Sequence, residues 1–174
     1  MQCKTAFVTG GGSGIGLALA ETLAKRGARI AAFDLRFSEA ARARLRAVCP
    51  DALFFEVDVR DAEGVDAAVK KAVAQIGAPK VAINSAGVQV ARPFLEISSE
   101  RYDFVVDINL KGSRNFAAAV LRHMRSGGHL ALVASIAGVV SNYGYAAYSS
   151  SKFGVVGLAS ALRIECKTRG ICVS

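Results

Sequence analysis

Short apolar segments alternate along the chain with longer segments in which apolar residues recur every three or four positions. The short segments contain few polar residues, which is typical of strands that are buried on both faces of a parallel sheet. They predict six strands near residues 5–8, 29–33, 53–57, 81–83, 130–134 and 171–173. The longer segments predict helices at 14–25, 61–75, 98–124 and 146–168, and one more helix that ends near residue 49.

Strands that are separated by helices form one sheet covered on both sides, because each right-handed crossover packs its helix back onto the sheet. We therefore predict an α/β protein with a doubly wound parallel-sheet Rossmann fold that stops after the sixth strand. The 174 residues contain no linker and no repeat, so we expect a single domain, residues 1–174. Ligands of such sheets bind at the carboxyl ends of the strands.

Composition narrows the class of protein further. Hydrophobic residues make up 52% of the chain and charged residues 21%, which excludes a disordered protein. No apolar segment reaches the roughly 20 residues that a membrane span needs. The first residues also lack the pattern of a signal peptide. We expect a cytoplasmic protein that does not contact a membrane.

The net charge of +8 raises the question of an anionic partner. The basic residues are dispersed except for Arg42, Arg44 and Arg46, and no aromatic residues alternate with them. This pattern is typical of a solvated helix face, so we expect no nucleic-acid partner. A positive field would instead attract a dinucleotide pyrophosphate. We expect reduced thiols and no metal site, because metal-ligand spacing is missing among Cys3, Cys49, Cys166 and Cys172.

A glycine-rich loop, residues 9–16, separates the first strand from the first helix. Glycines let the backbone turn tightly and approach a pyrophosphate, and the helix N-terminus adds free N–H groups and a positive dipole end. Glycines also form ordinary turns, but the strand–turn–helix context favours a phosphate loop. We expect this loop to bind the cofactor through Gly10, Ser13, Gly14, Ile15 and Gly16.

Asp34 ends the second strand, where a carboxylate can accept hydrogen bonds from the 2′-hydroxyl of an adenosine ribose. The same charge would repel a 2′-phosphate. Arg36 is a possible partner for such a phosphate, whereas Ser13 stands where a basic residue would bind it. We therefore favour NAD over NADP. The alternative reading of Asp34 is an ordinary turn residue at a strand end.

Tyr148 and Lys152 are four residues apart at the start of a helix and share one face. An ammonium close to a phenol favours its ionised form, and such a phenol can exchange a proton with a carbonyl or alcohol oxygen. Ser135 follows the fifth strand at the ligand-binding edge and could orient the same oxygen. Each residue alone fits an ordinary surface position. Their combination with the glycine loop predicts an oxidoreductase.

With these residues in place, the sequence resembles the short-chain dehydrogenase/reductase family along essentially its whole length. The motifs that carry the resemblance are TGGGSGIG at 9–16, Asp34, Asp58-Val59, NSAG at 84–87, Asn109, Ser135 and YSSSK at 148–152. Ser85 replaces a second asparagine that is common in the family. The resemblance implies hydride transfer between NAD(H) and a carbonyl or secondary alcohol, with Tyr148 as acid/base and Ser135 holding the substrate oxygen.

The resemblance also implies roles around the cofactor. Asp58 would hold the adenine ring by its side chain and Val59 by its backbone. Lys152 would bind the hydroxyls of the nicotinamide ribose. Asn109 would interrupt its helix and hold a water that links Lys152 to solvent. The floor under the adenosine ribose would be formed around Asn84, Ala86 and Gly87.

Substrate and partners are less constrained by the sequence. The residues expected on the pocket side favour an apolar substrate: Gln89, Phe94, Ile136, Ala137, Val139 and Tyr145. Helices 98–124 and 146–168 are apolar beyond what one sheet face can cover, which predicts a homodimer or a larger homo-oligomer. The resemblance implies the same pairing of helices.

Members of the resembled family continue beyond the sixth strand with a loop near the nicotinamide, a substrate-covering segment and a seventh strand. The 174-residue sequence contains none of these. We therefore expect a frayed sixth strand with an open edge, weakened binding at the nicotinamide end and low turnover. The alternative function is that of a non-catalytic dinucleotide-binding or interaction protein.

Overall fold

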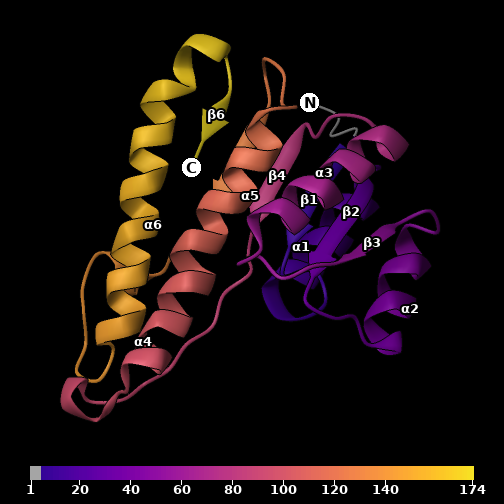
Figure 1. Cartoon of the computed structure of the whole chain (residues 1–174). Coiled ribbons are helices and arrows are strands. Elements are labelled where there is room, and N and C mark those ends of the chain that lie inside the picture. The colour runs from indigo at the N-terminus through magenta and orange to yellow at the C-terminus, as the bar shows by residue number, and fades with distance from the viewer. Residues whose placement is uncertain (1–4) are drawn as a thin grey trace.

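A six-stranded parallel sheet forms the centre of the computed structural model, which describes residues 5–174 (Figure 1). The strand order is β3-β2-β1-β4-β5-β6, so the chain reverses its direction of growth between β1 and β4. Each predicted strand is present, and the predicted Rossmann fold is confirmed. The strands are β1 Thr5–Thr9, β2 Arg29–Asp34, β3 Leu53–Glu56, β4 Val81–Asn84, β5 His129–Leu132 and β6 Cys172–Val173.

Helices cover both faces of the sheet. Capping explains where several begin: Ser38, Asp61 and Ser98 each accept a hydrogen bond from a backbone N–H in the first turn that follows. The helices are α1 Gly14–Lys25, α2 Glu39–Val48, α3 Ala62–Ile76, α4 Ser99–Val106, α5 Gly112–Leu121 and α6 Ala146–Glu165. Three short 3-10 helices, not predicted from the sequence, span Phe94–Glu96, Ile136–Gly138 and Lys167–Arg169.

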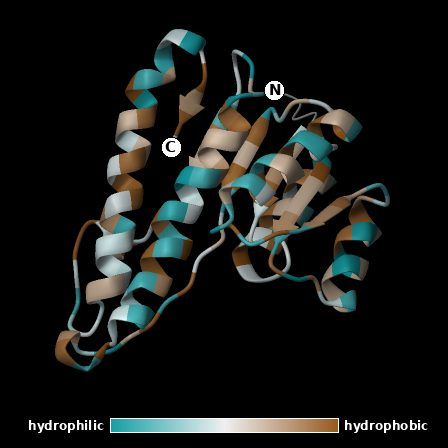
Figure 2. Cartoon of the chain, viewed as in Figure 1, coloured by the Kyte–Doolittle hydropathy of each residue, from teal (hydrophilic) through white to brown (hydrophobic). Residues whose placement is uncertain are grey.

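The core is divided into two layers by the sheet. Ala6 and Val8 of β1 face α1 and α2, whereas Phe7 between them faces α3, α5 and α6. Phe33 is the centre of the second layer, with the rings of Phe7 and Phe116 5.6 and 5.8 Å away. Hydrophobic residues concentrate on the sheet and on the inner helix faces, while α2 turns a hydrophilic face outward (Figure 2).

The predicted continuous helix 98–124 is wrong in detail. A π-helical turn, η2 (Asp107–Lys111), lies between α4 and α5, and α5 ends at Leu121. Asn109 lies in this turn, and its side chain forms hydrogen bonds with the backbone of Val88. The wider π-helical turn accommodates this contact. The interruption of the helix at Asn109 that the family resemblance implied is therefore confirmed.

The C-terminal elements also differ from expectation. The predicted helix 146–168 ends at Glu165, because Gly170, with a φ of 64°, reverses the chain after a short 3-10 turn. The sixth strand is not frayed. Cys172 and Ser174 donate backbone hydrogen bonds to the carbonyls of Gly128 and Leu130, and Leu132 donates to Ser174. β6 is nevertheless an edge strand, as expected.

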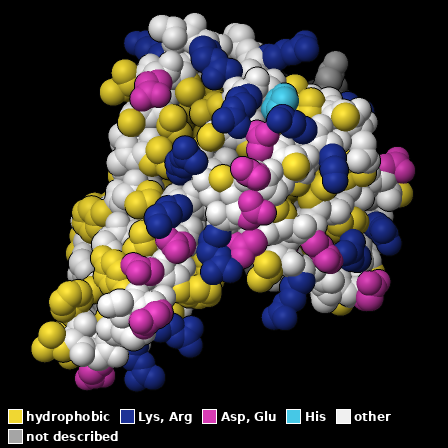
Figure 3. All heavy atoms as spheres, viewed as in Figure 1, with side chains coloured by type: hydrophobic (Ala, Val, Ile, Leu, Met, Phe, Trp, Pro, Cys, Tyr) yellow, Lys and Arg dark blue, Asp and Glu magenta, His cyan; other side chains and the backbone are white. Residues whose placement is uncertain are grey.

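Two further expectations concern the charged side chains and the cysteines. Lys and Arg are spread among Asp and Glu on the face in Figure 3 instead of forming one basic patch. Cys49, Cys166 and Cys172 are free thiols, while Cys3 lies outside the described residues. Within residues 5–174, no helix is long and apolar enough to cross a membrane, and no cluster of metal-ligating side chains is found.

Candidate active site

A cavity of about 660 Å³ opens at the carboxyl edge of the sheet. Its volume lies within the roughly 300–1,000 Å³ of small-molecule and cofactor sites. Segments that follow β1, β2, β3, β4 and β5 form its walls, and α4, η2 and α6 close one side. Among the predicted site residues, those on the lining are Gly10, Ser13, Gly14, Ile15, Gly16, Asp34, Asp58, Val59, Ala86, Gly87, Tyr148 and Lys152.

The glycine loop brings backbone N–H groups to this cavity. Gly10 has a φ of 67°, and a Cβ at this position would lie 2.9 Å from the backbone nitrogen of Ala86, so only glycine fits there. The first hydrogen bond of α1 runs from Leu17 N–H to the Ser13 carbonyl. The N–H groups of Gly14 and Ile15 therefore have no intrahelical acceptor and are available to an anion.

Asp34 links the end of β2 to the glycine loop. Its Oδ2 atom accepts a hydrogen bond from Gly12 N–H at 2.8 Å, and its half-buried side chain lines the cavity. Arg36 lines the same end of the cavity and is exposed. A carboxylate and a guanidinium therefore share the region where the sequence predicted the adenosine ribose.

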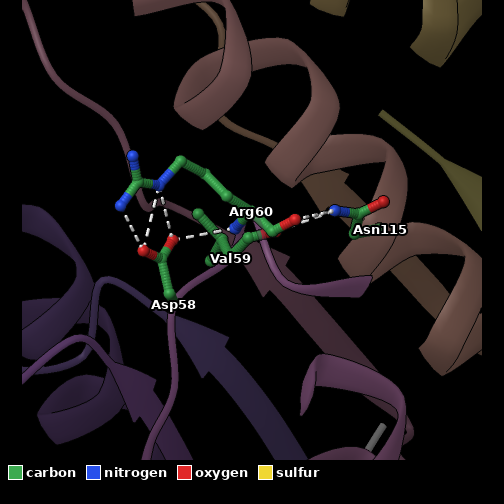
Figure 4. Close-up of polar contacts among 4 residues, drawn as sticks. All are labelled: Asp58, Val59, Arg60 and Asn115. Atoms are coloured by element: carbon green, nitrogen blue, oxygen red, sulfur yellow. Dashed lines mark hydrogen bonds and ion pairs between the residues drawn. The ribbon is translucent and has the colours of Figure 1, made fainter. Parts of the chain in front are cut away.

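Asp58 and Arg60 form a close ion pair on the cavity wall beyond β3 (Figure 4). The Arg60 guanidinium donates to Asp58 Oδ2 at 2.6 Å, and the Arg60 backbone N–H donates to Oδ1 at 2.9 Å. These hydrogen bonds hold the pKa of Asp58 below its usual value. Arg60 also lies over the ring of Phe104 at 5.7 Å. Arg60 was not among the site residues predicted from the sequence, although it lies only two residues after Asp58 and carries the opposite charge.

A buried chain of hydrogen bonds supports the cavity floor from below. Thr9 Oγ1 donates to Asn84 Oδ1 at 2.8 Å, Asn84 Nδ2 donates to Ser113 Oγ at 2.8 Å, and Ser113 Oγ donates to the Asn109 carbonyl. Asn84 is only 2% exposed and lies outside the cavity lining. Asn84 therefore supports the cavity floor from below and does not line the cavity itself. Thr9 was identified from the sequence only as the first residue of the glycine-loop motif, and Ser113 was not identified.

The Asn109 side chain continues this network toward α6. Its Oδ1 accepts from Val88 N–H at 2.8 Å, and its Nδ2 donates to the Val88 carbonyl and to Ser151 Oγ at 2.9 and 3.0 Å. Ser151 in turn donates to the Tyr148 carbonyl at 2.7 Å. Asn109 lies outside the cavity lining and is buried. It joins the loop after β4 to the start of α6.

Tyr148 and Lys152 stand on the same wall of the cavity, as their spacing on α6 predicted. The Lys152 ammonium lies 5.8 Å from the centre of the Tyr148 ring and donates to the Val133 carbonyl at 2.8 Å. Lys152 is 6% exposed, and this burial lowers the pKa of its ammonium. An ammonium keeps three donors, so Lys152 can bind a ligand as well as Val133.

Ser135 follows β5 and begins the 3-10 turn Ile136–Gly138. Its half-buried hydroxyl accepts a hydrogen bond from Ala137 N–H at 3.1 Å and retains its own hydrogen for another acceptor. Ser135 lies outside the lining of the cavity described above, beside exposed apolar residues. Of the predicted substrate-side residues, Phe94, Ile136 and Val139 are exposed, whereas Ala137 is buried.

The doubly wound sheet and the cavity at its carboxyl edge define a Rossmann protein of the nucleotide-binding class. A family model described as short chain dehydrogenase matches residues 4–174. The chain belongs to the short-chain dehydrogenase family. Members of this family are oxidoreductases that act on alcohol or carbonyl groups with nicotinamide cofactors.

Several characterised proteins are similar to this chain. A D-threitol dehydrogenase from Mycolicibacterium smegmatis is 40% identical over 175 residues, covering 98% of the chain and 67% of that protein. A 3-dehydrosphinganine reductase from Arabidopsis thaliana is 40% identical over 182 residues, covering 100% of the chain and 54% of that protein. The chain thus spans between about half and two thirds of the length of these relatives.

Solved structures agree with the fold. The crystal structure of a carveol dehydrogenase from Mycobacterium avium, in complex with NAD, superimposes with a TM-score of 0.92 at 28% identity. The match covers 98% of this chain and 68% of that structure. A dehydrogenase/reductase from Sinorhizobium meliloti superimposes with a TM-score of 0.88 at 32% identity, over 99% of this chain and 70% of that structure.

Proposed function

We propose that this chain binds NAD(H) and transfers a hydride between it and a carbonyl or secondary alcohol substrate, with NADP(H) the less favoured cofactor. The observation that carries the proposal is the position of Tyr148 and Lys152 in the same cavity as the glycine loop. A phenol and a buried ammonium beside a phosphate-binding loop are the groups that such a reaction requires.

The residues on the cavity fit the parts of a dinucleotide. Asp34, Asp58 and Val59 would hold the adenosine at one end, with Ala86 and Gly87 below it. The N–H groups of the glycine loop would bind the pyrophosphate in the middle. At the other end, the Lys152 ammonium would bind the nicotinamide ribose, because its neighbour Val133 uses only one of its donors. The carboxylate of Asp34 favours NAD, since it would repel a 2′-phosphate.

When bound, the cofactor supplies the hydride. The Tyr148 hydroxyl gives a proton to the substrate oxygen in reduction and takes it back in oxidation. The Ser135 hydroxyl, with its hydrogen free, donates to the same oxygen and stabilises charge there. The Val133 carbonyl holds the Lys152 ammonium 5.8 Å from the centre of the Tyr148 ring. Asn109 holds the loop at Val88 and would position a water that connects Lys152 to solvent.

A titration of the 174-residue protein with NADH and NADPH, followed by cofactor fluorescence and thermal shift, tests binding. A panel of polyols, small ketones and long-chain keto compounds, added to the same samples, tests turnover. Tyr148→Phe is the matched variant, because it removes only the hydroxyl. We expect NADH binding within twofold of the original protein and a loss of activity of roughly 10²–10⁴-fold. Failure of the original protein to bind either dinucleotide would refute the proposal, and binding without turnover would support the non-catalytic alternative.

Two finer points accompany this proposal. Exposed apolar side chains in the turn that begins at Ser135 and directly after it favour an apolar substrate: Ile136, Val139 and Val140. Hydrophobic side chains also gather along α6 on the molecular surface (Figure 3), where Phe153, Val156 and Ile164 are exposed. This supports a homodimer formed through α4, α5 and α6. Light scattering at micromolar concentration would detect it, and a monomer there would contradict it.

A further inference from the structure

The segment Asp58–Arg60 has little secondary structure of its own and is held in place by α5. Val59 and Arg60 follow β3, and neither belongs to a strand or helix. The Asn115 side chain crosses to this segment from α5 (Figure 4). Its Nδ2 donates to the Val59 carbonyl at 2.9 Å and to the Arg60 carbonyl at 3.3 Å. Asn115 is 8% exposed, so water does not readily replace these contacts.

The peptide unit between Val59 and Arg60 forms hydrogen bonds on two opposite sides. In a trans peptide the C=O and N–H groups point in opposite directions. The Val59 carbonyl points to Asn115, and the Arg60 N–H points to Asp58 Oδ1 at 2.9 Å (Figure 4). Asn115 therefore sets the orientation of the peptide unit on which the Asp58 carboxylate rests.

Two further contacts fix the orientation of the Asn115 amide and the position of α5 against Val59. The Arg114 guanidinium donates to Asn115 Oδ1 at 3.1 Å, which leaves the Nδ2 donors facing the two carbonyls. Gly112 lies on the same face of α5, three residues before Asn115, and a Cβ there would lie 2.7 Å from Val59 Cγ2. One face of α5 thus holds both the side chain and the carbonyl of Val59.

We infer that Asn115 is a positioning residue for the adenine end of the cofactor site. It acts through the Val59–Arg60 peptide unit and does not line the cavity itself. The inference rests on the proposed function, in which Asp58 and Val59 hold the adenine. Nothing in this arrangement reaches Tyr148 or Lys152. The effect of Asn115 is therefore confined to ligands that carry an adenosine.

The test compares two halves of the cofactor by calorimetry: ADP-ribose, which carries the adenosine, and reduced nicotinamide mononucleotide, which does not. Asn115→Leu has nearly the same shape and removes both donors. We expect about tenfold weaker binding of ADP-ribose, as for the loss of a buried hydrogen-bond donor, and an unchanged affinity for the mononucleotide. Asn115→Gln keeps the donors and should fall between the original protein and the leucine variant.

Two controls keep the outcomes separate. Val120→Ala opens a cavity in the buried part of α5, so it should lower stability without a selective loss of ADP-ribose binding. If Asn115→Leu does not fold, Arg114→Met tests the same contact, because it removes the hydrogen bond that orients the Asn115 amide toward the Val59 carbonyl. This variant should show a smaller selective loss of ADP-ribose affinity. The role of Asn115 would be overturned if the original protein, Asn115→Leu and Arg114→Met bound ADP-ribose equally well. It would also be overturned if Asn115→Leu lost affinity for both ligands by the same factor. If the original protein binds neither ligand, the proposed function itself fails.

Discussion

Thr9 joins the phosphate loop to the loop after β4 through a single hydroxyl. Its Oγ1 donates to Asn84 Oδ1 at 2.8 Å and accepts from the N–H groups of Ser85 and Ala86, both at 3.1 Å. A hydroxyl has one donor and two acceptor sites, so all of them are used. Thr9 is 1% exposed, and Ser85 and Ala86 line the cavity.

Thr9→Val keeps the branched shape and removes all three hydrogen bonds. A buried polar group without a partner costs about 1–3 kcal/mol. The carbonyl oxygen of the Asn84 side chain is fully buried, whereas the two N–H groups are half-buried and regain part of their hydration. We therefore expect the free energy of unfolding to fall by about 2–3 kcal/mol, and the melting temperature to fall by about 4–12 °C for a domain of this size.

Urea unfolding and calorimetry measure these changes, and an NADH titration measures the effect on the cavity. Thr22→Val is the matched control, because the Thr22 hydroxyl is exposed and donates only to the Ala18 carbonyl within α1. We expect a change within about 0.5 kcal/mol for this control. If Thr9→Val also stays within that range, the hydroxyl does not connect the two loops energetically, and the reasoning is wrong.

The remaining predictions concern charge. Burial lowers the pKa of Lys152 from its ordinary 10.5, so the folded state binds fewer protons than the unfolded state between the two pKa values. The free energy of unfolding should therefore gain a contribution as pH rises through that window. Lys152→Met should lack this gain in urea unfolding from pH 7 to 10.5, and an unchanged slope would contradict the assignment. Asp34→Asn keeps the side-chain shape and removes the charge. It should raise the ratio of NADPH to NADH affinity about tenfold in a fluorescence titration, and an unchanged ratio would argue against Asp34 as the selecting group.

Local pattern was sufficient for the elements of this fold. The predicted helix at 14–25 matches α1, and the predicted strands match within a few residues. The places where the prediction was wrong have tertiary causes. The helix at 98–124 is broken by the contact of Asn109 with Val88, which lies 21 residues away in the sequence. Helical periodicity cannot register such a contact, because apolar spacing continues through the break.

The candidate site divides in the same way. Motifs of a few residues, the glycine loop and the Tyr148–Lys152 pair, are visible in the sequence because their members are held together by one turn or one helix face. The residues that support them are not. Ser113 and Asn115 belong to no motif, Thr9 is visible only as the first residue of the glycine-loop motif, and the partners of all three lie elsewhere in the chain.

The sequence by itself determined the family, the parallel sheet and most residues on the cavity wall. Only the tertiary structure decided which buried side chains hold that wall in place. Asn115 meets Val59 across 56 residues, and Thr9 meets Ala86 across 77. Such contacts exist only after crossover helices have brought distant strands side by side, and a hydrogen bond depends on final distance and orientation, which no local spacing specifies.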